Sequence, residues 1–215
     1  IKYLLEILSK EGHSDIALDL ALQTTYPSWG YMLQNENEPA TTLWELWNSD
    51  TEGPNMNSRN HHMFGTISSW FYKYIAGIQP IDPGYSRIKI RPTAVDHPKL
   101  SHMSARVSTP QGDAFVSWKR DEQNGTPGLI IEVHVPIGAS AILDIPVKKQ
   151  ETIAVEGVLL WFQGQQIHKV HGITVASSSE EGRVLLELTT GRFRFHAIVT
   201  RHHSPKENSF DGATE

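Results

Sequence analysis

The sequence lacks cysteine altogether, and it lacks long apolar runs and clusters of positive charge. Without cysteine, disulfides, thiolate chemistry and cysteine-rich zinc sites are excluded. No apolar run approaches the roughly 18 residues that a membrane-spanning helix needs, so we expect no membrane partner. The 24 acidic residues outnumber the 19 Lys and Arg residues, and the basic residues form no run. We therefore expect no nucleic-acid partner either.

The sequence begins inside a helical pattern. Its first apolar residues recur at i, i+3, i+4 and i+7, which places them on one face of a helix; they are Ile1, Leu4, Leu5 and Leu8. No starting Met, charged leader or N-cap precedes them. We therefore expect a fragment of a longer protein, in which a targeting segment would not be visible and the compartment stays open.

The helical period continues through the first third of the chain. Gly12 is a natural C-terminal cap for the first helix, and a second helix opens at His13 or Ser14, which predicts a helical hairpin. A third helix is predicted from about Arg59 to Ala76. Residues 26–59 between them form a long segment rich in Trp and Tyr. A loop of this length is usually functional or disordered, and its aromatic content argues against disorder.

After Pro80 the apolar period becomes two, which predicts an antiparallel sandwich or barrel. A turn is expected at residues 121–125, and the polar stretch 201–215 is expected to be a frayed tail. The predicted strands lie at residues 87–91, 115–119, 131–135, 141–147, 184–188 and 193–197.

The most informative segment places one acid, Glu45, beside Trp44 and two residues before Trp47. Aromatic rings cover the apolar faces of sugars, and a carboxylate among such rings is what glycoside hydrolysis needs. The alternative is that both tryptophans are core anchors and Glu45 is a solvated residue at a helix start. Composition alone favours that alternative.

A second candidate is the pair His61 and His62, expected at the head of the third helix. A histidine there can donate to a sugar hydroxyl or to a carboxylate. Neighbouring helical side chains point about 100° apart, whereas metal ligands on helices prefer i, i+3 or i+4 spacing. We therefore expect no metal site, and the alternative is one capping and one exposed histidine.

Four stretches together resemble the bacterial α-L-rhamnosidases of glycoside hydrolase family 78. They keep that family's order and rough spacing, and they are YPSWGYM at 26–32, ATTLWELW at 40–47, SRNHHMFG at 58–65 and WFYKYIAGI at 70–78. The resemblance covers residues 1 to about 145 and weakens in the final seventy.

The resemblance implies an α+β multidomain chain. Residues 1–78 would be the last helices of an incomplete (α/α)6 six-hairpin barrel, residues 79–200 an antiparallel β-sandwich, and residues 201–215 the tail. It implies hydrolysis of terminal α-L-rhamnose with inversion at the anomeric carbon. By the same resemblance Glu45 is the general base and His61 contacts the sugar. The weaker candidates for ring contacts are Trp29, Trp44 and Trp47.

The family's general acid lies upstream of these motifs, outside this sequence. An inverting enzyme needs both carboxylates, so we expect the isolated chain to have little or no hydrolase activity. We also expect an upstream segment or partner chain to complete the barrel by docking on the faces of Leu4, Leu5 and Leu8. The base step needs no cofactor. The alternative to an enzyme part is a non-catalytic carbohydrate-binding or structural fragment.

Overall fold

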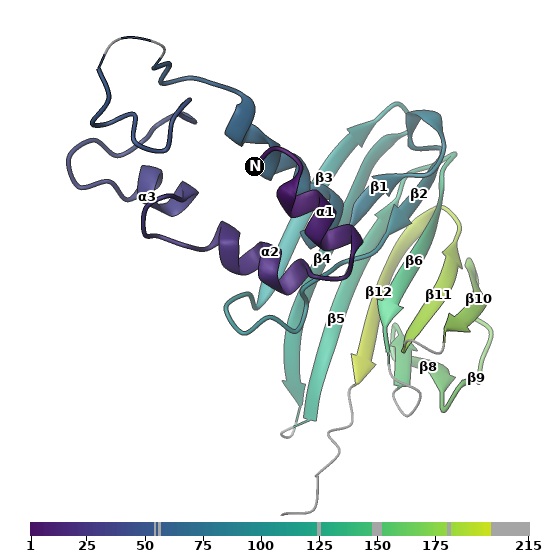
Figure 1. The fold of residues 1–215 in the computed structure, drawn as a ribbon. Helices are drawn as coiled ribbons and strands as arrows, with labels where there is room; N and C mark the ends of the chain where they lie inside the picture. The colour runs from purple at the N-terminus through teal and green to yellow at the C-terminus, as the bar shows by residue number, and fades with distance from the viewer. Residues whose placement is uncertain (54, 56, 124–125, 148–151, 180–181, 199–215) are drawn as a thin grey trace, which may run out of the picture.

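The computed structural model describes residues 1–53, 55, 57–123, 126–147, 152–179 and 182–198 (Figure 1). It contains a helical part followed by two packed β-sheets, which confirms the predicted α+β class. The predicted tail at 201–215 and residues 124–125 of the predicted turn lie outside the described residues. In the described part, no helix is both long and apolar enough to cross a membrane.

The predicted helical hairpin is present as α1 (Leu4–Lys10) and α2 (Ser14–Ala21). Gly12 adopts a φ of +88°, a conformation that costs little only for glycine, and the His13 N–H returns to the Leu8 carbonyl at 2.8 Å. Gly12 therefore ends α1 by the mechanism that the sequence predicts.

The predicted third helix begins later than expected and is not uniform. It consists of the 3-10 turn η1 (Met63–Gly65), the α-helix α4 (Thr66–Trp70) and the π-helical turn η2 (Phe71–Ile75). The prediction that it starts at Arg59 is wrong, because the backbone of residues 58–61 instead pairs with residues 42–45. A short helix that the sequence did not predict, α3 (Trp29–Leu33), lies within the aromatic segment.

The exposed face of α1 differs from the predicted docking face. Leu5 is only 4 % exposed and Leu8 is partly buried, because α1 packs this side against α4. Tyr3, Leu4 and Ile7 are 61 %, 40 % and 53 % exposed. The expectation that Leu5 lies on an open docking face is therefore wrong, whereas Leu4 is exposed and Leu8 keeps part of its surface.

Two sheets form the sandwich, and nearly all neighbouring strands are antiparallel. One sheet has the order β1-β2-β6-β11-β10 and the other β3-β4-β5-β12-β7-β8-β9, with β2 and β6 the one parallel pair among the described strands. The strands are β1 (Ile78–Pro80), β2 (Arg87–Ile90), β3 (His102–Thr109), β4 (Gly112–Gln123), β5 (Thr126–Val135), β6 (Ser140–Pro146), β7 (Thr152–Val155), β8 (Val158–Phe162), β9 (Gln165–Gln166), β10 (Ile173–Ser179), β11 (Arg183–Leu188) and β12 (Gly191–Ile198). A further 3-10 turn, η3 (Pro83–Tyr85), precedes β2.

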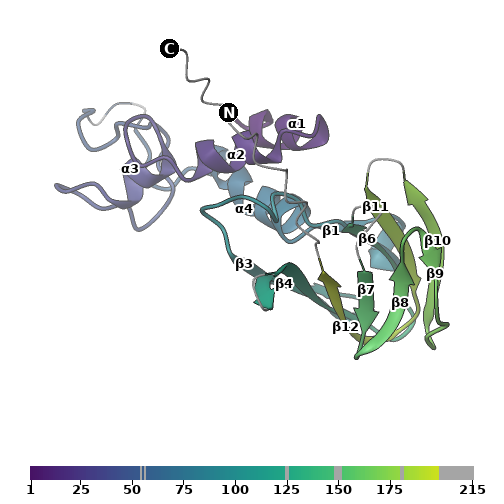
Figure 2. The ribbon, with the colours of Figure 1, turned by 90° about the horizontal axis from the view of Figure 1, so that it is seen from below.

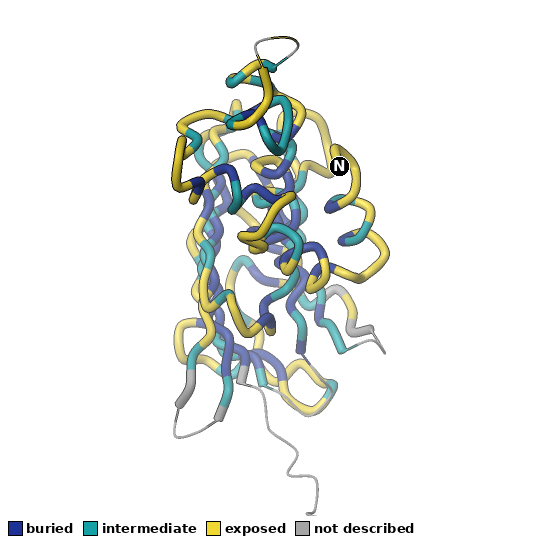
Figure 3. The backbone as a smooth tube through the Cα atoms, turned by 60° about the vertical axis from the view of Figure 1, so that its left-hand side comes forward, coloured by how far each residue is buried: buried dark blue, intermediate teal, exposed yellow. Residues whose placement is uncertain are grey.

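Every predicted strand corresponds to an observed one, and its alternation sorts side chains between core and solvent. Figure 3 shows the buried residues concentrated along the sheets and the exposed ones mostly in the connecting loops. Within α3, Trp29 and Met32 are buried. The inward side chains include Ile88, Ile90, Val116, Trp118, Ile131, Leu143, Ile145, Leu186 and Phe195.

The helical part and the sandwich share one core. The Thr93 N–H and hydroxyl both donate to the Tyr74 carbonyl at 2.9 Å, and the buried residues of both parts form a single apolar cluster. Gly77, with φ +84°, joins the two parts; a Cβ there would lie 2.2 Å from the Arg91 carbonyl carbon. In both Figure 1 and Figure 2, the α3 segment lies on the far side of α1 and α2 from strands β8–β10.

Candidate active site

The aromatic segment is held by a cluster of three rings. Trp47 stacks on Phe64 with ring centroids 3.8 Å apart, and Trp29 meets Trp47 edge-on at 5.2 Å. The Trp29 indole also donates to the Phe64 carbonyl at 3.1 Å. Ser28 starts α3 by accepting the Tyr31 N–H at 2.9 Å on its hydroxyl, which directs Trp29 inward. The cluster joins α3, the Trp-Glu-x-Trp motif and η1.

Glu45 is held at two points by Ser58. Its backbone N–H donates to the Ser58 carbonyl at 2.8 Å, and its Oε2 accepts the Ser58 N–H at 2.8 Å. The carboxylate is partly exposed, neither sealed in the interior nor free to rotate. The second carboxylate oxygen, Oε1, does not take part in the hydrogen bond from the Ser58 N–H. A backbone bond to one oxygen fixes the direction of the other.

His61 lies on the segment that pairs with the Glu45 segment. Its backbone N–H donates to the Leu43 carbonyl at 2.8 Å, two residues before Glu45. The ring Nδ1 accepts the Met63 N–H at 3.2 Å. An Nδ1 that accepts a hydrogen bond leaves the ring proton on Nε2, which can donate to a hydroxyl.

The two histidines lie at the head of the third helix as expected, with His62 at the N-cap position of η1. The expectation that their side chains point about 100° apart is wrong, because their rings stack with centroids 5.1 Å apart and an interplanar angle of 12°. His62 is exposed, whereas His61 is partly buried. In the described part of the chain, no group of three or more His, Asp and Glu side chains could hold a metal ion.

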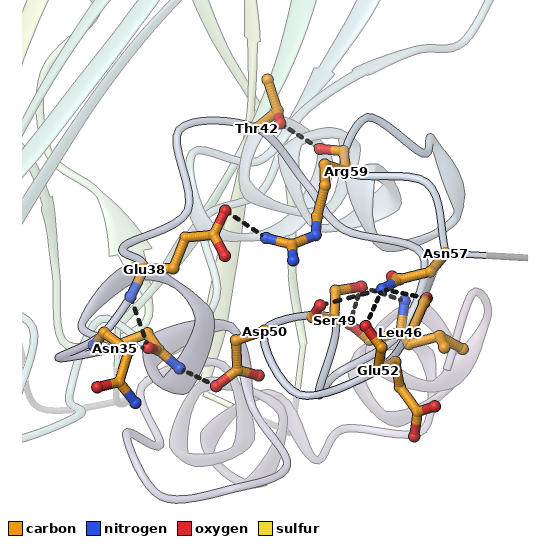
Figure 4. A network of polar contacts seen from close by, with 11 residues as sticks. Asn35, Glu38, Thr42, Leu46, Ser49, Asp50, Glu52, Asn57 and Arg59 are labelled. Atoms are coloured by element: carbon orange, nitrogen blue, oxygen red, sulfur yellow. Dashed lines mark hydrogen bonds and ion pairs between the residues drawn. The ribbon is translucent and has the colours of Figure 1, made fainter. Parts of the chain in front are cut away.

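Arg59 braces the same pair of segments from the side. Its guanidinium lies 5.2 Å from the centroid of the Trp44 ring, and its Nη1 pairs with Glu38 Oε1 at 2.6 Å. Thr42 donates its hydroxyl to the Arg59 carbonyl (Figure 4). The Arg59 cation therefore lies over the ring of Trp44, the residue that precedes Glu45 in the sequence.

Asp50 holds the loop to α3. Its Oδ2 accepts the Tyr31 hydroxyl at 3.0 Å. The same oxygen accepts the Asn35 amide at 2.7 Å (Figure 4). The hydrogen bond to Asp50 raises the pKa of Tyr31 above its usual value. Asn35 accepts the N–H groups of Asn37 and Glu38 on Oδ1, a local turn that the Asn-Glu-Asn sequence could have indicated. Sequence reasoning missed these bracing residues.

The structure therefore brings Glu45, His61 and Trp47 onto adjoining segments, and it places Trp29 and Trp44 beneath them. Trp29 and Trp44 are only 5 % and 2 % exposed. This burial agrees with the alternative that Trp44 is a core residue. Trp47 is partly buried and keeps some exposed surface. Chemically, the group offers one oriented carboxylate oxygen, one imidazole donor and one aromatic edge.

Two family models match adjoining parts of the chain. Residues 1–75 match the bacterial α-L-rhamnosidase six-hairpin glycosidase domain, and residues 77–159 match the bacterial α-L-rhamnosidase C-terminal domain. An α-L-rhamnosidase of Formosa agariphila is 38 % identical over 156 residues, covering 70 % of this chain and 16 % of that protein. One of Streptomyces avermitilis is 32 % identical over 197 residues, covering 89 % of this chain and 17 % of that protein.

Solved structures give the same result. The α-L-rhamnosidase from Dictyoglumus thermophilum superposes with a TM-score of 0.75 at 26 % identity, covering 92 % of this chain and 20 % of that one. The Streptomyces avermitilis enzyme, crystallised with L-rhamnose, gives 0.72 at 28 % identity, with 91 % and 17 % covered. The chain thus spans less than a fifth of the curated relatives it matches. With the end of a six-hairpin domain followed by the C-terminal domain, the chain belongs to the bacterial α-L-rhamnosidase family.

Proposed function

We propose that this chain supplies the general-base side of an inverting α-L-rhamnosidase site, with Glu45 as the base. The observation that carries the proposal is the fixed carboxylate: Ser58 holds Oε2 and leaves Oε1 to accept a proton from water. A base must be oriented before the reaction, because reorientation during the step would add to the barrier.

His61 and Trp47 fit the sugar-contacting roles. The Nε2 proton of His61 is available to a sugar hydroxyl, because Nδ1 is engaged by Met63. Trp47, packed on Phe64, presents a rigid ring edge. Trp29 and Trp44 support these groups from below, since their rings are almost fully buried.

The general acid is assigned to sequence upstream of this chain. Inverting glycosidases place their two carboxyl groups about 6.5–9.5 Å apart, with the water at one of them. Exposed apolar side chains at the start of α1, namely Leu4 and Ile7 with the capping Tyr3, offer a face for the remaining helical hairpins, as one longer chain or as a partner chain. We therefore expect the 215 residues alone to be inactive.

The test compares this chain alone, the longer protein, and the longer protein with Glu45→Gln, using release of an aryl leaving group from an α-L-rhamnoside. Activity should require the upstream part and should fall by about 10²–10⁴-fold in Glu45→Gln. Glu36→Gln, an exposed acid of the same segment, is the matched control and should retain activity.

Product stereochemistry tests the mechanism separately. NMR during the first turnovers should detect β-L-rhamnose, the inverted anomer. An α-anomer would overturn inversion. Full activity in Glu45→Gln would remove Glu45 from the mechanism, provided circular dichroism shows the fold intact.

A further inference from the structure

A cleft of about 1000 Å³ lies where the helical hairpin meets the sandwich. It opens between the α1–α2 turn and the end of the strands β2, β6 and β11. Neither Glu45, His61 nor Trp47 lines it. Its volume is at the upper end of the roughly 300–1000 Å³ typical of small-molecule sites, enough for a short oligosaccharide.

The sandwich side of this junction cleft carries more cations than anions, because Lys89, Arg91, Lys99 and Arg183 line it together with Asp96. Arg91 and Arg183 both pair with the single carboxylate of Asp144, at 3.2 and 2.5 Å, and that carboxylate is almost fully buried. One carboxylate neutralises one guanidinium, so the group keeps a net positive charge. Arg91 contacts Asp144 through Nε, so its two terminal nitrogens do not take part in this ion pair. Lys89, on β2, adds another positive charge to the wall.

The helical wall carries two acceptors beside the cation Lys10. Asp15 and Asp19 of α2 both line the cleft. Asp19 is already engaged, because its Oδ1 accepts Lys99 Nζ at 2.8 Å and lies 3.5 Å from His97 Nε2. Asp15 is exposed. Carboxylates on this wall would repel a polyanion such as a nucleic acid, but they readily accept hydroxyl donors.

A ligand that fits both walls needs one anionic group and several hydroxyls. A guanidinium fork matches the two oxygens of a carboxylate, and a neighbouring ammonium adds a point charge. We propose that the junction cleft binds a carboxylate-bearing saccharide, with the carboxylate on Arg91 and Lys89 and a hydroxyl on Asp15. The choice of a saccharide rests on the proposed function above, whereas the choice of an anion rests on the cleft alone.

Isothermal titration of the 215-residue chain with a trisaccharide that carries a single glucuronate tests the proposal, with a neutral trisaccharide as the matched ligand. The glucuronate-bearing trisaccharide should bind and the neutral sugar should not. Lys89→Glu should weaken binding at least about tenfold, the loss of one charge-assisted contact. Lys119→Glu, the same charge reversal on exposed β4 surface, should leave the affinity unchanged.

Each contrary result overturns the proposal. These are absence of binding, equal binding of the neutral sugar, or equal loss in both lysine variants with folds intact. Binding by this chain that disappears in the longer protein would show that upstream sequence fills the cleft, which also overturns it. Glu45→Gln should bind the glucuronate-bearing trisaccharide normally, so failure of the glycosidase mechanism and failure of the cleft give different results.

Discussion

Trp118 on β4 donates its indole N–H to the carbonyl of Ile75, the last residue of η2, at 2.7 Å. The side chain is 1 % exposed. The bond therefore joins the helical part to the sandwich within the core, at the C-terminal end of η2 where carbonyls lack helical partners.

We expect Trp118→Phe to destabilise the chain more than Trp161→Phe, which removes the same ring atoms from β8, away from the junction. The difference should be about 1–3 kcal/mol, because the buried Ile75 carbonyl loses its partner. Urea denaturation measures both. Equal losses would show that the hydrogen bond adds nothing beyond packing.

Gly77→Ala should destabilise the chain more than Gly157→Ala. Both glycines have nearly the same φ, +84° and +82°, so both changes carry the same backbone strain of about 1 kcal/mol or more. Only Gly77 has a backbone neighbour, Arg91, within 2.2 Å of the added Cβ; Gly157 has no atom within 4 Å. Urea midpoints should separate the two variants, and matching midpoints would contradict a tight junction.

Asp19 should stabilise the junction in a pH-dependent way. The hydrogen bond from Lys99 lowers the pKa of Asp19 below 3.8, with His97 adding to the effect. A lowered folded-state pKa means that the stabilisation is present above 3.8 and is lost as pH falls through the folded-state value. The stability gap between parent and Asp19→Asn should therefore close in acid. Asp15→Asn, an exposed change on the same helix, should show a smaller gap at neutral pH.

Tyr74 should make the chain sensitive to alkali. Burial, and then the negative charge of Glu6, raise the pKa of Tyr74 to about 12 from 10.0. The folded state keeps the proton while the unfolded state loses it, so this stabilisation falls as pH rises from about 10 to about 12. Tyr74→Phe should flatten that part of the stability profile, whereas the exposed Tyr72→Phe should leave it unchanged. Denaturation midpoints across this range provide the measurement.

Ser58 should position Glu45 through its backbone. In the longer protein, Ser58→Ala keeps the N–H that binds Oε2, and kcat should stay within a few-fold. Ser58→Pro removes that N–H and should lower kcat by about 10²-fold, the cost of a misplaced catalytic group, with KM little changed. A parallel loss in both variants would assign the effect to the Ser58 hydroxyl, which accepts the Asn60 N–H.

Much of the fold follows from apolar period. The spacing of three to four locates α1 and α2, and strict alternation locates β2, β4, β5 and β12, because each of these elements buries one face. The strands β7 to β9 are short, at most five residues, and give too few alternations to recognise. The start of the third helix was misplaced because pairing between loop segments far apart in sequence overrides local helical preference.

Some residues of the candidate site can also be predicted from the sequence, and others cannot. Glu45 and His61 can be selected because their chemistry is carried by side chains within a recognisable motif. Ser58 could not, since its contribution is a backbone N–H that any residue except proline would supply. The burial of Trp29 depends on α3, which was not predicted, and composition cannot distinguish a buried ring from an exposed one.

The family models divide the chain between residues 75 and 77, yet the molecule has no seam there. The Tyr74 and Ile75 carbonyls accept hydrogen bonds from Thr93 and Trp118 on the other side of this boundary. Gly77 also packs closely against the backbone of Arg91. If the gene were divided at this boundary, both products would expose apolar core residues that are buried in the intact chain, and both would tend to aggregate. Transfer of the sandwich into another protein should therefore give a folded product only when the terminal helices are transferred with it.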